Sequence, residues 1–258
     1  MLTYDRALIT GASAGIGEAF AEHLAAQGCA LVLVARRTDL LKSLAERLTE
    51  RHGVDVEVIP ADLADSEQLR LVEQRLLDEE RPVDLLVNNA GIGETRPFID
   101  CPVDSEEKTL LVNALAPTRL CHAALRTMVR RDRGGIINIS SVAGQLIAYQ
   151  NSTTYGASKA YLCSLSESIR LETRKKGSKV AVTLVCPGYV KTDMTTKDKV
   201  PAYAWVPKEK VVEESLQGLA QNKPLVVPGT LYKLAVFAAK YLPRPVVRMF
   251  AADAPKED

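Results

Sequence analysis

The sequence predicts an α/β fold: a doubly wound parallel sheet of about seven strands in a single domain, with a small helical extension at the C-terminal end. Three observations support it. Short apolar runs alternate with segments of helical periodicity through six successive units. A Gly-rich turn joins the first apolar run to the first helical segment, as in phosphate-binding βα turns. Several later runs end in small or polar residues, as expected at the ligand-binding edge of a parallel sheet.

Hydrophobic spacing places the elements along the chain. Apolar runs of strand length cover residues 6–10, 30–35, 54–60, 84–88, 135–140 and 180–186, and the second is apolar throughout, as a strand buried on both faces should be. Between them, apolar residues repeat with helical spacing at 18–27, 38–52, 66–80, 104–128 and 155–174. Ser66 stands at the start of the third of these helices, where it is placed to cap the free N–H groups.

The chain beyond residue 186 is less regular. Residues 193–207 are expected to form a loop that carries the only tryptophan, Trp205, so this loop is a candidate lid over a substrate. A helix follows at 208–221, then a short strand at 225–228 and an apolar helix at 231–241.

The last segment, 230–258, is basic as well as apolar. Lys233, Lys240, Arg244 and Arg248 occur in it, and no acidic residue intervenes up to Phe250. Three alternatives fit this composition: packing on the protein's own fold or on a twin subunit, peripheral contact with a membrane surface, or a flexible end.

The composition bounds the class of protein. With 258 residues, of which 47% are hydrophobic and 25% charged, the chain is long enough to bury a sizeable core. A net charge of +1 gives no reason to expect a nucleic-acid surface. The start of the chain lacks the pattern of a secretion signal, and no run of about 18 uncharged apolar residues predicts a membrane span.

The cysteines indicate a reducing, cytoplasmic location. They are odd in number, widely spaced and mostly set in apolar runs, which is typical of buried free thiols. No Cys-x-x-Cys or His-x-x-x-His spacing is present, so we expect no metal site. The five are Cys29, Cys101, Cys121, Cys163 and Cys186.

The Gly-rich turn at 10–17, Thr-Gly-Ala-Ser-Ala-Gly-Ile-Gly, is a candidate phosphate site. Glycine lets the backbone turn tightly and approach a ligand, and the N–H groups and dipole of a helix start attract an anion. The alternative is a turn with only a structural role. The candidate contacts are Gly11, Ser13, Ala14, Gly15, Ile16 and Gly17.

Two strand ends carry residues suited to the adenine and its ribose in a dinucleotide. Arg36 and Arg37 follow the second strand, where an acidic residue would bind a ribose 2′-hydroxyl and where Arg accommodates a 2′-phosphate. A planar guanidinium binds phosphate oxygens bidentately, so the pair favours NADP(H), although it could also be a solvated pair at a strand end. Asp62 and Leu63 follow the third strand; Asp62 could accept a hydrogen bond from an adenine amino group or serve a turn.

Polar residues recur at the ends of later elements. Asn88-Asn89-Ala90-Gly91 ends the fourth strand, where amides can satisfy backbone groups and leave a flat surface beside a ligand. Asn113 lies among aliphatic residues and needs a hydrogen-bond partner, which a structural role would also supply. Ser141 follows the fifth strand, and Thr192, after the sixth, could hydrogen-bond a carboxamide.

Tyr155 and Lys159 stand four residues apart in a helical segment, so they share one face. A phenol with a pKa near 10 is a poor acid/base at neutral pH, and a nearby ammonium lowers that pKa by favouring the phenolate. The pair is therefore a candidate general acid/base for a substrate oxygen. Pairs with this spacing also occur on solvated helices without any chemical role.

Taken together, these motifs resemble the short-chain dehydrogenase/reductase family over residues 6–195. The spacing of the glycines resembles the compact branch, because three residues separate the first two where the epimerase-like branch has two. The chain departs from the family's common pattern at Ala116-Pro117, where many members have a glycine; this is expected to alter a helix bend. The matching motifs are Thr10-Gly11-x-x-x-Gly15-x-Gly17, Asn88-Asn89-Ala90-Gly91, Asn113, Ser141, Tyr155-x-x-x-Lys159 and Pro187-Gly188-x-Val190-x-Thr192.

The resemblance implies a role for each matching residue. Tyr155 would be the acid/base, and Lys159 would lower its pKa and bind the nicotinamide ribose. Ser141, preferred to Ser140 as the second of the pair, would hydrogen-bond the substrate oxygen, and Asn113 would hold a water in a proton relay to Lys159. The cofactor contacts would be Gly11, Ser13, Ala14, Gly15, Ile16, Gly17, Arg36, Arg37, Asp62, Leu63, Asn89, Ala90, Gly91, Tyr155, Lys159, Pro187, Gly188, Val190 and Thr192.

The expected protein is an NADP(H)-dependent oxidoreductase that interconverts a hydrophobic ketone or aldehyde and its alcohol. Residues 1–229 would form its Rossmann-like catalytic domain and 230–258 a C-terminal helix and tail. Its partners would be a small-molecule substrate and copies of itself, in a dimer or tetramer. The alternatives are a sensor that binds NADP(H) without reacting and a sugar-nucleotide epimerase or dehydratase; the glycine spacing disfavours the latter.

Overall fold

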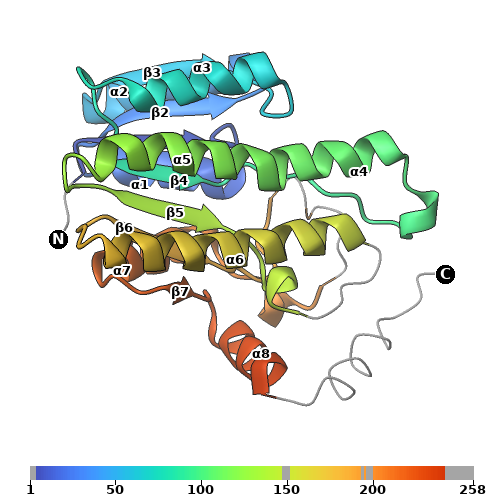
Figure 1. The fold of residues 1–258 in the computed structure, drawn as a ribbon. Helices are drawn as coiled ribbons and strands as arrows, with labels where there is room; N and C mark the ends of the chain where they lie inside the picture. The colour runs from blue at the N-terminus through green and yellow to red at the C-terminus, as the bar shows by residue number, and fades with distance from the viewer. Residues whose placement is uncertain (1–3, 147–151, 193–194, 196–199, 242–258) are drawn as a thin grey trace.

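The doubly wound sheet predicted from the sequence is present in a computed structural model of the chain, which describes residues 4–146, 152–192, 195 and 200–241 (Figure 1). In this described part, seven parallel strands form one sheet in the order β3-β2-β1-β4-β5-β6-β7. The chain starts in the middle at β1, runs outward to β3, then crosses to β4 and runs outward to β7. The order therefore reverses between β1 and β4, which is where such sheets bind ligands.

The strands agree with their predicted positions to within two residues. Their central members are buried on both faces, so their sequences are apolar throughout and easy to recognise. The register is continuous across the switch point, because Ile9 pairs with Leu33 on one side and with Val87 on the other. The strands are β1 (Arg6–Thr10), β2 (Ala30–Ala35), β3 (Val56–Pro60), β4 (Leu85–Asn88), β5 (Gly135–Ile139), β6 (Ala181–Val185) and β7 (Leu225–Val226).

Helices cover both faces of the sheet (Figure 1). One apolar cluster joins the sheet to α1, α2 and α7 through residues such as Phe20, Leu41 and Val211. A second cluster on the other face includes Leu69 of α3 and Leu120 of α5, next to α6. The helices are α1 (Gly15–Ala25), α2 (Thr38–His52), α3 (Ser66–Leu77), α4 (Val103–Leu110), α5 (Ala116–Met128), α6 (Thr153–Lys175), α7 (Lys208–Ala220) and α8 (Thr230–Tyr241).

The helix predicted at 104–128 contains a wide turn. Between α4 and α5, the segment Leu111–Leu115 is π-helical, and Asn113 lies at its centre. Pro117 explains the change, since it has no N–H to donate to the carbonyl of Asn113 four residues earlier. A single π turn thus precedes Ala116-Pro117, and the altered helix bend stays a prediction.

The residue that caps α3 is Asp65, so the assignment to Ser66 is wrong. The Asp65 carboxylate accepts hydrogen bonds from the backbone N–H groups of Glu67 and Gln68 at 2.9 and 3.1 Å. Ser66 is already the first helical residue. The chain offered two adjacent capping side chains, and Asp65 is the one with extended backbone.

We expect Asp65→Ala to lower the melting temperature by about 2–4 °C and Ser66→Ala to leave it nearly unchanged. Hydrogen bonds from Gln68 and Glu67 lower the pKa of Asp65, so its stabilising effect is present above the unfolded-state pKa and lost as the pH falls. Calorimetry should therefore show the two variants converging below about pH 4. A larger loss from Ser66→Ala than from Asp65→Ala would contradict the assignment.

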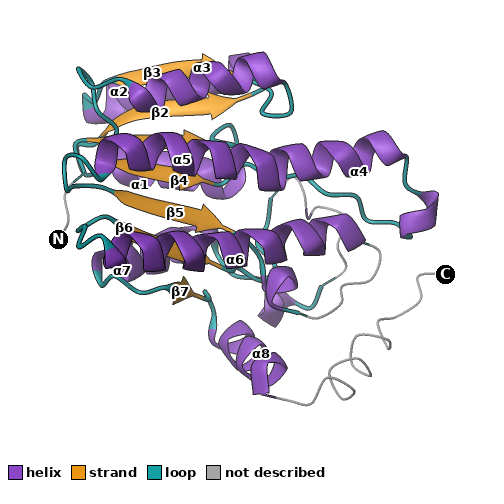
Figure 2. Ribbon diagram, in the orientation of Figure 1, coloured by secondary structure: helices purple, strands orange, loops and turns teal. Residues whose placement is uncertain are grey.

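Helix α8 lies beyond β7 at one edge of the layered part (Figure 2). Tyr232 packs it back onto the fold, donating to the Ala204 carbonyl at 2.7 Å and accepting from the Tyr189 N–H at 3.2 Å. Arg244 and Arg248 of the basic tail lie outside the described residues. Among the described helices, none combines the length and apolar character needed to cross a bilayer. The face of α8 turned away from the fold exposes Leu231, Leu234, Phe237 and Tyr241.

Candidate active site

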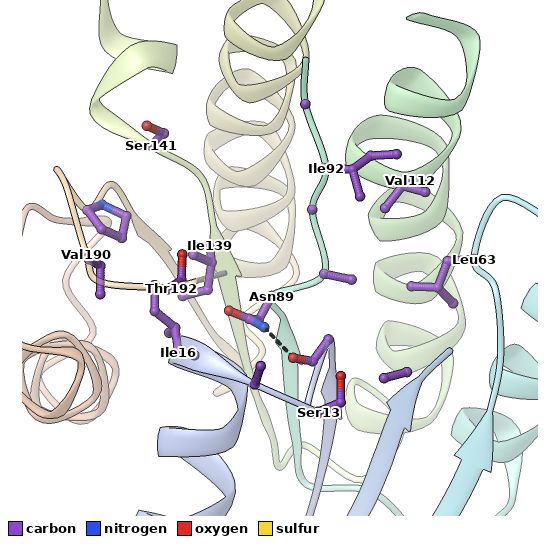
Figure 3. Close-up of a pocket in the computed structure, with 18 of the residues that line it drawn as sticks. Ser13, Ile16, Leu63, Asn89, Ile92, Val112, Ile139, Ser141, Val190 and Thr192 are labelled. Carbon is purple, nitrogen blue, oxygen red and sulfur yellow. Dashed lines mark hydrogen bonds between the residues drawn. The ribbon is translucent and has the colours of Figure 1, made fainter. Parts of the chain in front are cut away.

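A cavity of about 530 Å³ opens at the carboxyl ends of the strands (Figure 3). It runs along the edge where β1 and β4 meet, and Figure 3 shows Ser13 and Ser141 toward its opposite ends. Of the sequence-predicted site residues, the structure places all but Gly17 and Asn113 on its walls. Those on the walls are Gly11, Ser13, Ala14, Gly15, Ile16, Arg36, Arg37, Asp62, Leu63, Asn89, Ala90, Gly91, Ser141, Tyr155, Lys159, Pro187, Gly188, Val190 and Thr192.

The Gly-rich turn depends on two backbone conformations that favour glycine. Gly11 and Gly15 have φ values of +65° and +60°. A Cβ on Gly15 would also lie 2.9 Å from Cγ2 of Thr192, so the turn and the loop after β6 approach too closely for a side chain. Helix α1 begins at Gly15, with its N-terminal N–H groups at the cavity. This end of the cavity suits a phosphate group.

Gly17 lies beneath the cavity wall and does not line it. A Cβ at this position would be 2.3 Å from the carbonyl oxygen of Gly11 and 2.6 Å from Nδ2 of Asn89. Glycine is required at this position because α1 packs closely against the strand ends and leaves no room for a Cβ. Gly17 therefore shapes the turn that other residues present to a ligand.

Asn89 and Thr10 tie the ends of β4 and β1 together at the switch point. The Asn89 amide donates to the carbonyls of Thr10 at 2.9 Å and of Gly11 at 3.3 Å (Figure 3 shows Asn89 at this point). In return the Thr10 hydroxyl accepts the N–H groups of Asn89 and Ala90, both at 3.0 Å. The prediction that these amides satisfy backbone groups holds for Asn89. Asn88 instead points into the core, where it donates to Asn138 at 2.9 Å.

Positive charge gathers at the end of β2. Arg36 and Arg37 are both exposed and both on the cavity wall. Nε of Arg37 donates to the Ser13 hydroxyl at 3.2 Å, which brings the second strand end to the Gly-rich turn. Two guanidinium groups beside a helix N-terminus suit a second phosphate on a dinucleotide.

Asp62 performs the turn role that the sequence left open. One carboxylate oxygen accepts the Ala64 N–H at 3.1 Å, and the other pairs with Lys108 at 3.0 Å. Burial works to raise the pKa of Asp62, but the bonds from Ala64 and Lys108, together with the charge of Arg36, hold it below its usual value. Asp62 also lines the cavity. The contact with an adenine amino group stays a prediction.

Tyr155 and Lys159 lie on one face of α6 at the other end of the cavity. Lys159 is only 4% exposed, and its ammonium lies 5.6 Å from the centre of the Tyr155 ring. That ammonium donates to the carbonyl oxygen of Ile139, at the end of β5, at 3.0 Å. Ser141 caps the next short helical turn, Val142–Gln145, where its hydroxyl accepts the Ala143 N–H at 3.1 Å; as a hydrogen-bond partner it also lowers the pKa of Tyr155.

The electrostatics of this pair differ from the expectation. Burial raises the pKa of Tyr155 and outweighs the hydrogen bond from Ser141, which lowers it. Burial also lowers the pKa of Lys159 to about 8. The expected depression of the phenol pKa by Lys159 is therefore wrong for this arrangement. The ammonium donates to Ile139 and lies over the ring, Lys159 is buried, and Tyr155 is partly buried on the cavity wall.

The buried side-chain amide of Asn113 has its hydrogen bonds satisfied by protein groups. Its amide donates to the Ile92 carbonyl at 2.7 Å and to Ser158 at 3.1 Å, and its oxygen accepts the Ile92 N–H at 2.9 Å. A Cβ on Gly91 would lie 3.2 Å from the Lys159 nitrogen and 3.5 Å from that oxygen. Asn113 thus fixes the segment after β4 against α6, and the water relay stays a prediction.

Sequence reasoning missed Gly93, which lies directly against the candidate acid/base. A Cβ at Gly93 would be 2.7 Å from Cδ2 of Tyr155, so a side chain there would displace the ring. Its position two residues after the Asn-Asn-Ala-Gly motif was the available signal. The other wall residues that were not predicted are Val34, Ala35, Ala61, Ile92, Val112, Ile139, Ser140 and Thr195.

The two serines after β5, Ser140 and Ser141, have different hydrogen-bond partners, which favours Ser141 as the residue near a substrate. The Ser140 hydroxyl is buried and donates to the backbone carbonyl of Lys159 at 2.9 Å. Ser141 instead contacts Tyr155. Ser140 therefore holds α6 to the strand end, while Ser141 faces the acid/base.

Comparisons with known proteins agree with this geometry. The model of the short chain dehydrogenase family matches residues 5–201. Nodulation protein G from Rhizobium sp. (strain N33) is 35% identical over 237 residues, covering 88% of this chain and 94% of that protein. A short-chain dehydrogenase from Sphingobium yanoikuyae, solved in complex with NADPH, is 31% identical with a TM-score of 0.83, covering 98% of this chain and 97% of that one. The bulky-bulky ketone specific alcohol dehydrogenase from Comamonas testosteroni is 30% identical with a TM-score of 0.80, covering 100% and 97%.

Proposed function

The chain belongs to the short-chain dehydrogenase/reductase family, and from this premise we propose that it is an NADP(H)-dependent enzyme interconverting a carbonyl compound and its alcohol. The observation that carries the proposal is the placement of Ser141, Tyr155 and Lys159 at one end of a cavity whose other end suits phosphate. The cofactor fits this cavity by the chemistry of its walls: glycine turns, a helix N-terminus and two guanidinium groups.

The proton chemistry belongs to the chain's own residues. When bound, NADP(H) supplies or accepts the hydride. In carbonyl reduction, the Tyr155 hydroxyl donates a proton to the substrate oxygen, and Ser141 orients that oxygen by a hydrogen bond. The buried ammonium of Lys159, 5.6 Å from the centre of the Tyr155 ring, supplies positive charge at the reacting end of the cavity, and we assign it to the nicotinamide ribose. Because burial raises the pKa of Tyr155, the phenol is in its donating form at neutral pH.

A hydrophobic ketone or aldehyde is the proposed substrate class. Ile92, Val112 and Ile139 give the cavity apolar walls (Figure 3). Trp205 lies edge-on to Tyr189 at a centroid distance of 6.0 Å, beside the loop after β6. The similarity to an alcohol dehydrogenase named for bulky ketones supports the same class. In the sequence, the paucity of charges around Leu146, Ile147 and Tyr149 also favours a hydrophobic compound; Ile147 and Tyr149 lie outside the described residues.

The direct test is consumption of NADPH absorbance with a panel of bulky ketones, aldehydes, quinones and oxoacyl thioesters. Turnover with a hydrophobic carbonyl compound is the expected result. Binding of NADPH with no turnover on any member would favour the rival, a sensor that uses the same fold without reacting.

Arg36→Asp should shift cofactor preference from NADPH toward NADH by about tenfold or more, because a charge-assisted contact with the 2′-phosphate is replaced by repulsion. The ratio of kcat/KM for the two cofactors measures the shift. Arg51→Asp, on an exposed site at the end of α2, makes the same change in charge away from the cavity and serves as the control. An unchanged ratio in Arg36→Asp would refute the 2′-phosphate assignment.

The proposal also includes self-association of the chain and a cytoplasmic location. A dimer or tetramer formed through α5 and α6 would cover exposed apolar residues such as Leu115 and Leu171. Peripheral contact of α8 with a membrane surface is the alternative use of its exposed apolar face. The free state of all five cysteines supports a reducing, cytoplasmic location.

A further inference from the structure

Two cysteines that are distant in sequence meet behind Lys159. Cys163 lies on α6, one turn after Lys159, and Cys186 directly follows β6. The Gln145 amide donates to both sulfur atoms, at 3.1 Å to Cys163 and 3.5 Å to Cys186. The Cys186 thiol is also a hydrogen-bond partner of Cys163. The two sulfur atoms therefore lie close together under one shared donor.

The surroundings of Cys163 favour its thiolate. A hydrogen bond with Cys186, contacts with Ser140 and Gln145, and the charge of Lys159 lower the Cys163 pKa to about 7, although burial opposes them. The Ser140 oxygen lies 3.4 Å from the Cys163 sulfur. A thiolate that several donors stabilise is the reactive form of cysteine.

The other cysteines provide an internal contrast. Burial raises the pKa of Cys29 and of Cys121 to about 12. A hydrogen bond with Glu106 raises the pKa of Cys101 to about 11. These thiols are therefore protonated at neutral pH. Cys163 is also partly exposed, whereas Cys186 is fully buried against it, so an oxidant meets Cys163 first.

We propose that Cys163 and Cys186 form a redox-active dithiol, which a hydroperoxide oxidises to an intramolecular disulfide. In the first step the Cys163 thiolate attacks the peroxide O–O bond; with one proton taken up, this gives a sulfenic acid and releases an alcohol, or water from hydrogen peroxide. In the second, the Cys186 sulfur attacks that sulfenic acid, the S–S bond forms, and the hydroxyl leaves as water with the Cys186 proton. Overall the dithiol loses two electrons and two protons, equivalent to two hydrogen atoms, and the peroxide takes them up to give an alcohol and water, or two waters from hydrogen peroxide.

The disulfide would disturb the reacting end of the cavity. An S–S bond of about 2.05 Å is shorter than any hydrogen-bonded sulfur contact, so its formation must draw the end of β6 and α6 together. Pro187 and Gly188, which follow Cys186, line the cavity, and Lys159 lies one turn before Cys163. A displacement of about 1 Å at an active site can cost a hundredfold in rate. We therefore expect oxidation to lower turnover tenfold or more, a consequence that rests on the proposed function.

The disulfide itself is tested without any substrate. The full chain is reduced with dithiothreitol, freed of reductant, treated with hydrogen peroxide, alkylated and mapped by mass spectrometry. The expected product has lost two hydrogen atoms, contains one Cys163–Cys186 cross-linked peptide, and returns to the starting mass with dithiothreitol. Cys163→Ser and Cys186→Ala should each abolish the cross-link, while Cys101→Ser should form it as the wild type does.

Absence of the cross-link in the wild type, or an equal yield of other pairings, would overturn the proposal. So would peroxide consuming Cys29, Cys101 or Cys121 as fast as Cys163. NADPH affinity and turnover are measured separately. Both should fall when the wild type is oxidised and return with dithiothreitol, whereas peroxide should leave both unchanged in Cys186→Ala. Full affinity and turnover in the disulfide form would refute the coupling to the cavity. If no substrate were turned over, the proposed reaction would be refuted, and the mass measurement would still decide whether the disulfide forms.

Discussion

Replacing Tyr155 by phenylalanine is expected to lower turnover by about a hundredfold to ten-thousandfold while leaving NADPH affinity nearly unchanged. The change removes a single oxygen atom and keeps the ring that packs against Gly93. Since that oxygen is the proposed proton donor and contacts Ser141, its loss removes the proton transfer and one hydrogen bond. Steady-state turnover and a fluorescence titration with NADPH measure the two quantities separately.

Tyr161→Phe is the matched control for this experiment. Tyr161 lies on the same helix, is 45% exposed, and its hydroxyl contacts Thr118 at 2.9 Å, outside the cavity wall. Losing this oxygen should leave both turnover and affinity near wild type. Wild-type rates in Tyr155→Phe would remove the acid/base assignment, and a parallel loss of NADPH affinity would indicate a binding role instead.

The sheet could be predicted from sequence because its signals are local. A strand such as β2, buried on both faces, must be apolar at every position, and that pattern needs no knowledge of its neighbours. The Gly-rich turn is similarly local, since positive φ at Gly11 and Gly15 restricts the residue type directly. The strand-end residues then fall on one edge as a consequence of the parallel order.

The features that escaped prediction depend on partners far along the chain. Burial raises the pKa of Tyr155, and Lys159 donates to the carbonyl of Ile139; the four-residue spacing contains neither fact. The meeting of Cys163 and Cys186 requires α6 to pack on β6. By contrast, the wide turn at Asn113 had a local signal, the missing N–H of Pro117.

Replacing Lys159 by methionine is expected to lower turnover by about a hundredfold or more and to weaken NADPH binding. Methionine fills a similar volume, so the loss reports the charge. Lys159 is buried, and burial lowers its pKa to about 8, so the ammonium persists below that pH and is lost as the pH rises through it. Carbonyl reduction by the wild type should therefore decline as the pH rises through about 8.

The pH profile separates a role for this charge from a structural one. In Lys159→Met the decline that begins near pH 8 should disappear, because the group that titrates there is gone. Lys175→Met, at the exposed end of the same helix, removes an equal charge far from the cavity and should keep the wild-type profile. If Lys159→Met lost activity yet kept that decline, another group would be responsible for it, and Lys159 would serve only to hold the end of β5 through its bond to Ile139.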